Sequence, residues 1–77
     1  MAELSTAVVY YELWENRGGN LIAEFDSAEE ALRFVRDTVK GGGLADVLSW
    51  SLHRSDAAPP VAYGKALYAL VDKHMPA

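Results

Sequence analysis

The chain has 77 residues, of which 51% are hydrophobic, and it carries 11 acidic side chains against 7 basic ones. A chain of this length forms one domain, residues 1–77, and folding buries only about 60% of the surface that the unfolded chain exposes. Cysteine is absent, which excludes disulfides and thiolate metal sites, and two histidines are too few for a structural zinc site. Self-association is the remaining source of added stability, so we expect a homodimer.

The net charge of −4 comes from the first forty residues, and this acidic half would repel a phosphate backbone. The longest apolar run, residues 7–11, is far shorter than the roughly 20 residues of a membrane-spanning helix. The first residues also lack the basic region of a secretory signal peptide. We therefore expect a cytoplasmic protein without membrane contact.

The first half of the chain predicts a β-hairpin that follows a short flexible leader, residues 1–5. Residues 6–14 are rich in β-branched and aromatic side chains, which favour a strand, and residues 21–25 form a second apolar run. Between them lies a turn with Gly18 and Gly19, which adopt positive φ angles without steric cost. Two strands joined by so short a loop pair in the antiparallel sense.

The next segment predicts a helix that begins at a capping box. The Ser27 hydroxyl can accept a hydrogen bond from the amide of Glu30, whose carboxylate reaches back to the amide of Ser27. Three glycines, residues 41–43, end the helix. One side of the helix is apolar and faces the core, and the opposite side is charged. The apolar stripe consists of Ala28, Ala31, Leu32, Val35, Thr38 and Val39.

The rest of the chain predicts a strand over residues 46–54, a turn over 55–60, a short strand over 61–63 and a helix over 64–75. The fold class is then α+β with the order ββαββα, or ββαβα if the short strand does not form. An antiparallel sheet with two helices packed on one face buries all the apolar stripes. The expected core includes Tyr11, Leu13, Leu21, Ala23, Phe25, Leu48, Trp50 and Leu52 from the strands, and Leu67, Leu70, Val71 and His74 from the second helix.

This arrangement leaves one face of the sheet uncovered. Strict alternation along the strands places apolar and aromatic side chains there, together with the carboxylates of Glu12 and Glu24. A large apolar patch on a small domain marks an interaction site, and Trp and Tyr are favoured anchors. Two alternatives stay open: the alternation is shifted by one residue, or the leader or a turn covers Trp14. The predicted interface consists of Val8, Tyr10, Trp14 and Ile22, and Val47, Ser49, Ser51 and His53 are expected on the same face.

The sequence contains no motif for catalysis or for binding a cofactor. Ser51 and His53 are two residues apart on a strand and share a face, but a third group to orient the histidine is missing. Asp72 and His74 point in different directions from a helix and make a poor metal pair. We therefore predict no catalytic, cofactor-binding or metal-binding residues, and we do not expect an enzyme.

Three segments carry a resemblance to known proteins: residues 11–14, residues 19–22 and residues 25–31. They resemble a broad set of small uncharacterised bacterial proteins in which a β-hairpin leads into a helix opened by the motif F-D-[ST]-x-E-E-A. The same join is similar to that of AP2-type and integrase N-terminal DNA-binding domains, which have three strands before the helix and basic residues on the sheet. This chain shows two strands and acids there. The resemblance covers roughly residues 8–40 and implies a fold but no activity.

The sequence does not reveal a function, and it leaves three interpretations. The first is a non-catalytic protein-interaction module that self-associates as a homodimer through the open sheet face or an edge strand. The alternative is an acidic, antitoxin-like or inhibitory regulator that binds a basic protein partner. The least favoured is nucleic-acid binding through the aromatic sheet face, because the nearby charges are acidic. The acidic regulator would use Glu12, Glu15, Glu24, Glu29 and Glu30.

Overall fold

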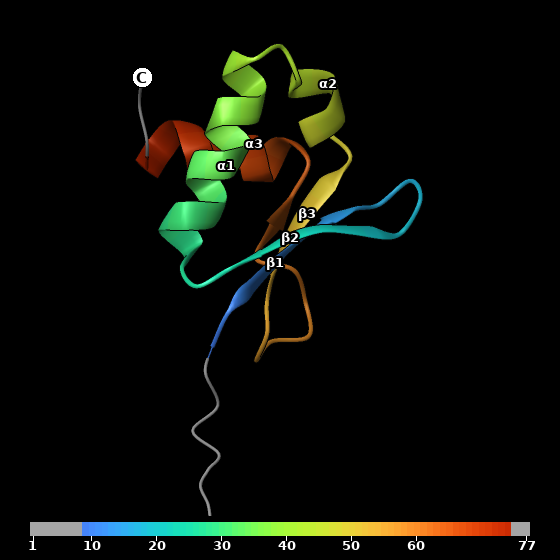
Figure 1. The fold of residues 1–77 in the computed structure, drawn as a ribbon, viewed down its shortest axis with the longest axis vertical. Helices are drawn as coiled ribbons and strands as arrows, with labels where there is room; N and C mark the ends of the chain where they lie inside the picture. The colour runs from blue at the N-terminus through green and yellow to red at the C-terminus, as the bar shows by residue number, and fades with distance from the viewer. Residues whose placement is uncertain (1–8, 75–77) are drawn as a thin grey trace, which may run out of the picture.

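The computed structural model describes residues 9–74, so the expected leader and Val8 lie outside the described residues. In chain order the elements are β1 (Tyr11–Glu15), β2 (Asn20–Phe25), α1 (Ala28–Lys40), α2 (Leu44–Val47), β3 (Trp50–Arg54), β4 (Ala62–Tyr63) and α3 (Lys65–His74). The strands form one antiparallel sheet in the order β2-β1-β3-β4, with the helices on one side of it (Figure 1). The predicted α+β class is confirmed, and α2 is an addition to the predicted order ββαββα.

The hairpin of β1 and β2 contains a β-bulge that simple alternation does not predict. Leu13 pairs with Ala23 but Trp14 pairs with Leu21, so Ile22 is an extra residue in β2. A bulge of this kind changes the side to which the following residues point. Leu21, expected in the core, is 44% exposed, whereas Ile22, expected on the open face, packs against the core. Both expectations are wrong because they assumed an unbroken alternation.

Helix α1 begins at the predicted capping box. Ser27 Oγ accepts a hydrogen bond of 3.2 Å from the amide of Glu30. The Glu30 carboxylate accepts from the amide of Asp26 at 3.2 Å, one residue before the predicted partner Ser27. The two contacts join the end of β2 to the first turn of the helix. The helix ends at Gly41, whose amide donates to the carbonyl of Asp37 at 3.0 Å.

Helix α2 replaces the first half of the strand predicted over residues 46–54. It begins after Gly43, whose carbonyl accepts hydrogen bonds of 3.1 Å from the amides of Asp46 and Val47. Val47, expected on the open face, is fully buried, and Leu48, expected in the core, is 42% exposed. The two residues exchange positions because successive side chains rotate by about 100° on a helix, and not by the 180° of a strand.

The core lies between the sheet and the helices α1 and α3. At its centre Leu13 of β1 pairs directly with Leu52 of β3, and both are almost completely buried. Trp50, also on β3, is buried as predicted. The helices cover these residues with Ala31, Leu32 and Val35 from α1 and Leu67 and Val71 from α3.

The end of the chain follows the prediction more closely. The short fourth strand forms and pairs with β3, and Gly64, with a φ of 58°, turns the chain into α3. His74, predicted on the apolar stripe of this helix, is exposed instead, because it lies in the last turn where the core ends. No helix among residues 9–74 has the length and the apolar character needed to cross a membrane.

We expect Leu52→Ala to lower the free energy of unfolding by about 2–5 kcal/mol, because it removes buried methyl groups and leaves a cavity. The matched control is Leu48→Ala, which removes the same atoms from a half-exposed side chain and costs less than about 1 kcal/mol. Urea denaturation followed by tryptophan fluorescence measures both values. Equal losses in the two variants would contradict the placement of Leu48 at the surface.

Candidate functional site

One face of the sheet carries no helix in the described part of the chain, because the apolar stripes of α1 and α3 both pack on the other face. On this open face, the strand register arranges the side chains in two rows that run across the sheet. The first, the Trp14 row, takes one residue from each strand and consists of Leu21, Trp14, Ser51 and Tyr63. The second, the Glu12 row, consists of Glu24, Glu12 and His53.

At both ends of the Trp14 row the side chains are apolar and exposed, and in its middle they are half-buried or buried. Tyr63 at one end is 62% exposed, and Leu21 at the other is 44% exposed. Trp14 is half-buried, and Ser51 beside it is only 3% exposed. Because Ser51 pairs with Trp14 on one side and with Tyr63 on the other, a small polar residue lies between two large rings.

The Glu12 row is charged, and it places two carboxylates side by side. Glu12 and Glu24 pair directly across β1 and β2, where like charges are unfavourable. Glu12 pairs with His53 on its other side, and its Oε1 accepts a hydrogen bond of 3.2 Å from Trp14 Nε1. Glu24 is exposed at the edge of the sheet. No group of three or more His, Asp or Glu side chains within residues 9–74 is arranged to hold a metal ion.

The pair Ser51 and His53 is in contact, with Ser51 Oγ 2.8 Å from His53 Nε2. Ser51 Oγ also donates to Asn16 Oδ1 at 3.0 Å. A hydroxyl group donates one hydrogen bond, so a Ser51 that donates to Asn16 accepts from His53 in the tautomer that carries its proton on Nε2. In that tautomer the imidazole is a donor to Ser51, whereas a general base would have to accept its proton. This geometry suits a contact that satisfies a buried hydroxyl.

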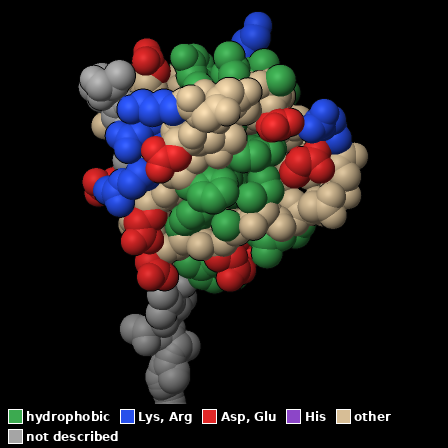
Figure 2. Space-filling model, turned by 45° about the horizontal axis from the view of Figure 1, so that its top comes forward, with side chains coloured by type: hydrophobic (Ala, Val, Ile, Leu, Met, Phe, Trp, Pro, Cys, Tyr) green, Lys and Arg blue, Asp and Glu red, His purple; other side chains and the backbone are tan. Residues whose placement is uncertain are grey.

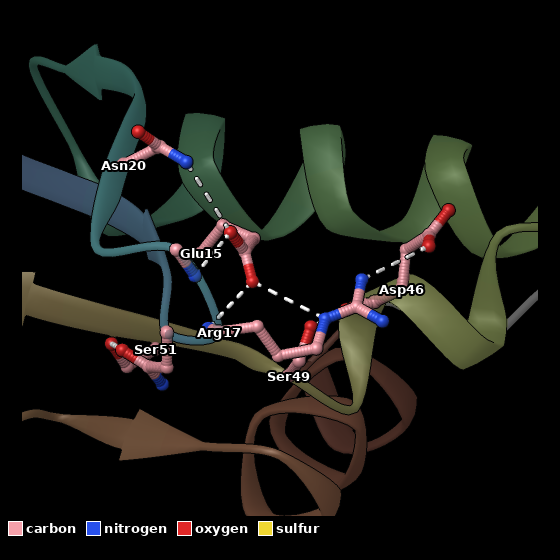
Figure 3. A network of polar contacts seen from close by, with 8 residues as sticks. Glu15, Arg17, Asn20, Asp46, Ser49 and Ser51 are labelled. Carbon is pink, nitrogen blue, oxygen red and sulfur yellow. Dashed lines mark hydrogen bonds and ion pairs between the residues drawn. The ribbon is translucent and has the colours of Figure 1, made fainter.

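Asn16 is held in place by the hairpin turn, which is organised around the carboxylate of Glu15 (Figure 3). Glu15 accepts hydrogen bonds from the amide of Arg17 at 2.6 Å and from the amide of Gly18 at 2.9 Å. The Arg17 guanidinium contacts Glu15 at 3.3 Å and Asp46 of α2 at 3.7 Å. The hydrogen bond from the Gly18 amide is the main cause that lowers the pKa of Glu15 from its ordinary value of 4.5.

Of the four residues predicted to form the interface, two lie on the open face. Tyr10 is 37% exposed just before β1, where its backbone amide donates to Ser55 Oγ at 3.0 Å. Trp14 lies in the middle of its row. Ile22 packs against the core at the bulge, and Val8 lies outside the described residues.

Sequence alternation did not identify two exposed members of the Trp14 row. Leu21 was not identified because the prediction assumed an unbroken alternation along the strand, and the bulge at Ile22 breaks it. The sequence did indicate the position of Tyr63, because it follows Ala62, which is buried, in the short strand predicted over residues 61–63. That alternation places Tyr63 on the open face once β4 pairs with β3.

The Glu15 carboxylate predicts a pH dependence of stability. Because its pKa is lowered in the folded chain, its charged form stabilises the fold above the unfolded pKa, and this contribution is lost as pH falls through the folded pKa. Between about pH 5 and pH 2 we expect the urea midpoint of the wild-type protein to fall more steeply than that of Glu15→Gln. Parallel curves for the two proteins would show that the charge of Glu15 does not contribute.

Comparison of the chain with protein-family models, with curated proteins and with solved structures gives no match. The resemblance to small bacterial hairpin–helix proteins and to AP2-type and integrase N-terminal domains therefore stays an expectation from the sequence. A function has to be argued from the open face and the edges of the sheet themselves.

Proposed function

We propose that the chain is a non-catalytic protein-interaction module that self-associates through the open face of its sheet. The observation that carries the proposal is the Trp14 row, which crosses the whole sheet and ends in the exposed side chains of Leu21 and Tyr63. Tyr10 adds a further ring to the same face. Exposed apolar strips on small domains mark interaction sites, and tryptophan and tyrosine are favoured anchors of interfaces.

A second copy of the chain is a suitable partner for this face. Two sheets pack face to face with their strands nearly aligned when the facing sides carry apolar residues. A domain of 77 residues without cysteine has a small core, so it gains stability when association buries further apolar surface. The chain is therefore expected to be more stable as a dimer than as a monomer.

The contacts of the open face also support a role without catalysis. Ser51 is 3% exposed and donates its hydroxyl proton to Asn16 Oδ1, so the arrangement favours a structural hydroxyl over a nucleophile. The carboxylates of the Glu12 row would repel the phosphates of a nucleic acid stacked on Trp14 and Tyr63. A protein is thus a better partner for the open face than a nucleic acid.

The alternative function, an acidic regulator of a basic protein, depends on how many of its five carboxylates are free to bind. Glu15 holds the hairpin turn, and Glu29 pairs with Arg33 at 3.3 Å. Glu30 belongs to the capping box, and Glu12 accepts from the Trp14 ring nitrogen. A binding surface that needs all five carboxylates is therefore less favoured than one that needs a single free carboxylate. The exposed carboxylate of Glu24 at the sheet edge is the best candidate for contact with a basic partner.

We expect the wild-type protein to elute as a dimer, with twice the monomer mass by light scattering and without nucleic-acid absorbance at 260 nm. Tyr63→Glu places a charge in the proposed interface and should give a folded monomer, because an unpaired buried charge opposes association. Trp14→Glu, at the centre of the row, should act in the same direction.

The control for self-association is Tyr68→Glu, which adds the same charge to an exposed tyrosine of α3, on the helical layer. This variant should remain a dimer. Circular dichroism checks that each variant is folded. A wild-type monomer over the whole micromolar range, or dimers in all variants, would contradict self-association through the open face.

A further inference from the structure

The outer edge of β2 is a strand edge that no described strand covers. β2 lies at one end of the sheet and has six residues, whereas β4 at the other end has two and follows Pro59 and Pro60. An uncovered edge presents backbone amides and carbonyls that can pair with a further strand. Short strands and prolines protect the β4 edge, so β2 is the edge that is open to a partner.

On the helical side, the β2 edge is bordered by aromatic rings. Phe34 of α1 packs against Phe25 of β2 with ring centroids 5.6 Å apart and the rings tilted by 57°, and it reaches Trp50 at 6.1 Å. Phe34 is nevertheless 39% exposed, and Ile22 packs beside the core at the bulge. Figure 2 shows apolar side chains gathered in the middle of one face, with acidic and basic side chains around them. A partner strand would find apolar surface on this side.

On the open-face side, the β2 edge is acidic. Glu24 ends the Glu12 row at this edge, and on its inner side it already faces the like charge of Glu12. A shallow hollow of about 410 Å³ lies at the end of the strand and is lined by Tyr10, Glu24, Phe25 and Asp26. A cationic side chain placed next to Glu24 would relieve the repulsion between the paired carboxylates.

We propose that the outer edge of β2 binds an extended segment of another protein in which basic and apolar residues alternate, and that this segment adds a fifth strand to the sheet. Directly opposed residues of neighbouring strands share a face. A basic residue opposite Glu24 lies on the open face, and its apolar neighbour opposite Phe25 lies on the helical side next to Phe34. Main-chain hydrogen bonds then give affinity, and the alternation gives specificity.

A second copy of the chain does not fit this edge. β2 has the sequence NLIAEF and contains no basic residue, so a second β2 would place no cation opposite Glu24. The charge of Glu24 on the edge strand also opposes pairing with a copy that carries the same charge. The charge of the edge therefore selects a basic partner, and the edge is a surface separate from the self-association proposed for the Trp14 row.

The test is fluorescence anisotropy with a defined probe, a fluorescein-labelled peptide of sequence Lys-Val-Lys-Val-Lys-Val, added to the full-length protein at low salt. Two control probes have the same length: Glu-Val-Glu-Val-Glu-Val reverses the charge, and a Lys-Val peptide N-methylated at alternate amides blocks strand pairing. We expect the first peptide to bind and both controls to bind at least about tenfold more weakly.

Protein variants locate the binding. Glu24→Lys should weaken binding of the Lys-Val peptide about tenfold, because it reverses the charge next to the added strand. Phe34→Ser should weaken it about fivefold, because it removes the ring proposed to contact that strand. Asp72→Lys makes the same charge change on an exposed residue of α3 and should change binding by less than about twofold. Tyr63→Glu should still bind the Lys-Val peptide more tightly than the Glu-Val peptide, so failure of self-association and failure of this proposal are distinguishable.

Three results would overturn the proposal. The first is the absence of binding by the Lys-Val peptide at low salt. The second is equal binding by the N-methylated peptide or equal weakening by Asp72→Lys, since either would mean that only net charge attracts the peptide. The third is strong protection from hydrogen exchange, in the free protein, of the outward-pointing β2 amides, which are not bonded to β1. Protection that disappears on dilution would assign the edge to a second copy, and protection that persists would assign it to the chain itself.

Discussion

The register between β1 and β3 is the constraint on which the other features of this structure depend. Leu13 and Leu52 pair at the centre of the sheet, and the helices bury both. A slip of one residue would turn Leu13 toward solvent and Trp14 toward the helices, so burial of apolar surface holds the strands in one alignment. The same alignment sets Trp14 beside Ser51 and Glu12 beside His53. The composition of the open face is thus a consequence of how the core is packed.

The parts of the fold that sequence predicts well are those that depend on residues close together in the chain. The hairpin and the capping box at Ser27 each involve a few consecutive residues, and both form. The bulge at Ile22 and the helix α2 were not predicted, because both interrupt segments whose alternation is typical of a regular strand. Val47 shows the reason: its burial depends on packing against distant elements, and this overrides a local alternation that resembles a strand.

The residues of the candidate site also fall into two groups, those that the sequence predicts and those that it does not. Tyr10 and Trp14 could be predicted because they lie in the first strand region, whose parity follows from the buried Leu13. Ile22 could not, because it lies at a bulge, and the register shift also brings Leu21 to the open face. The burial of Ser51 on an otherwise exposed face was also beyond prediction. It depends on Asn16, which is 35 residues away in the chain and is held by the hairpin turn.

The two surfaces proposed for this chain share the strand β2, and this makes them physically coupled. Leu21 ends the Trp14 row on β2, and Glu24 ends the Glu12 row on the same strand. A strand added at the β2 edge would lengthen both rows by one side chain, and its basic residue would offset the paired carboxylates that oppose burial of the open face. Binding at the edge would then favour self-association through the open face. Because coupling between binding equilibria is reciprocal, self-association would strengthen binding at the edge by the same factor.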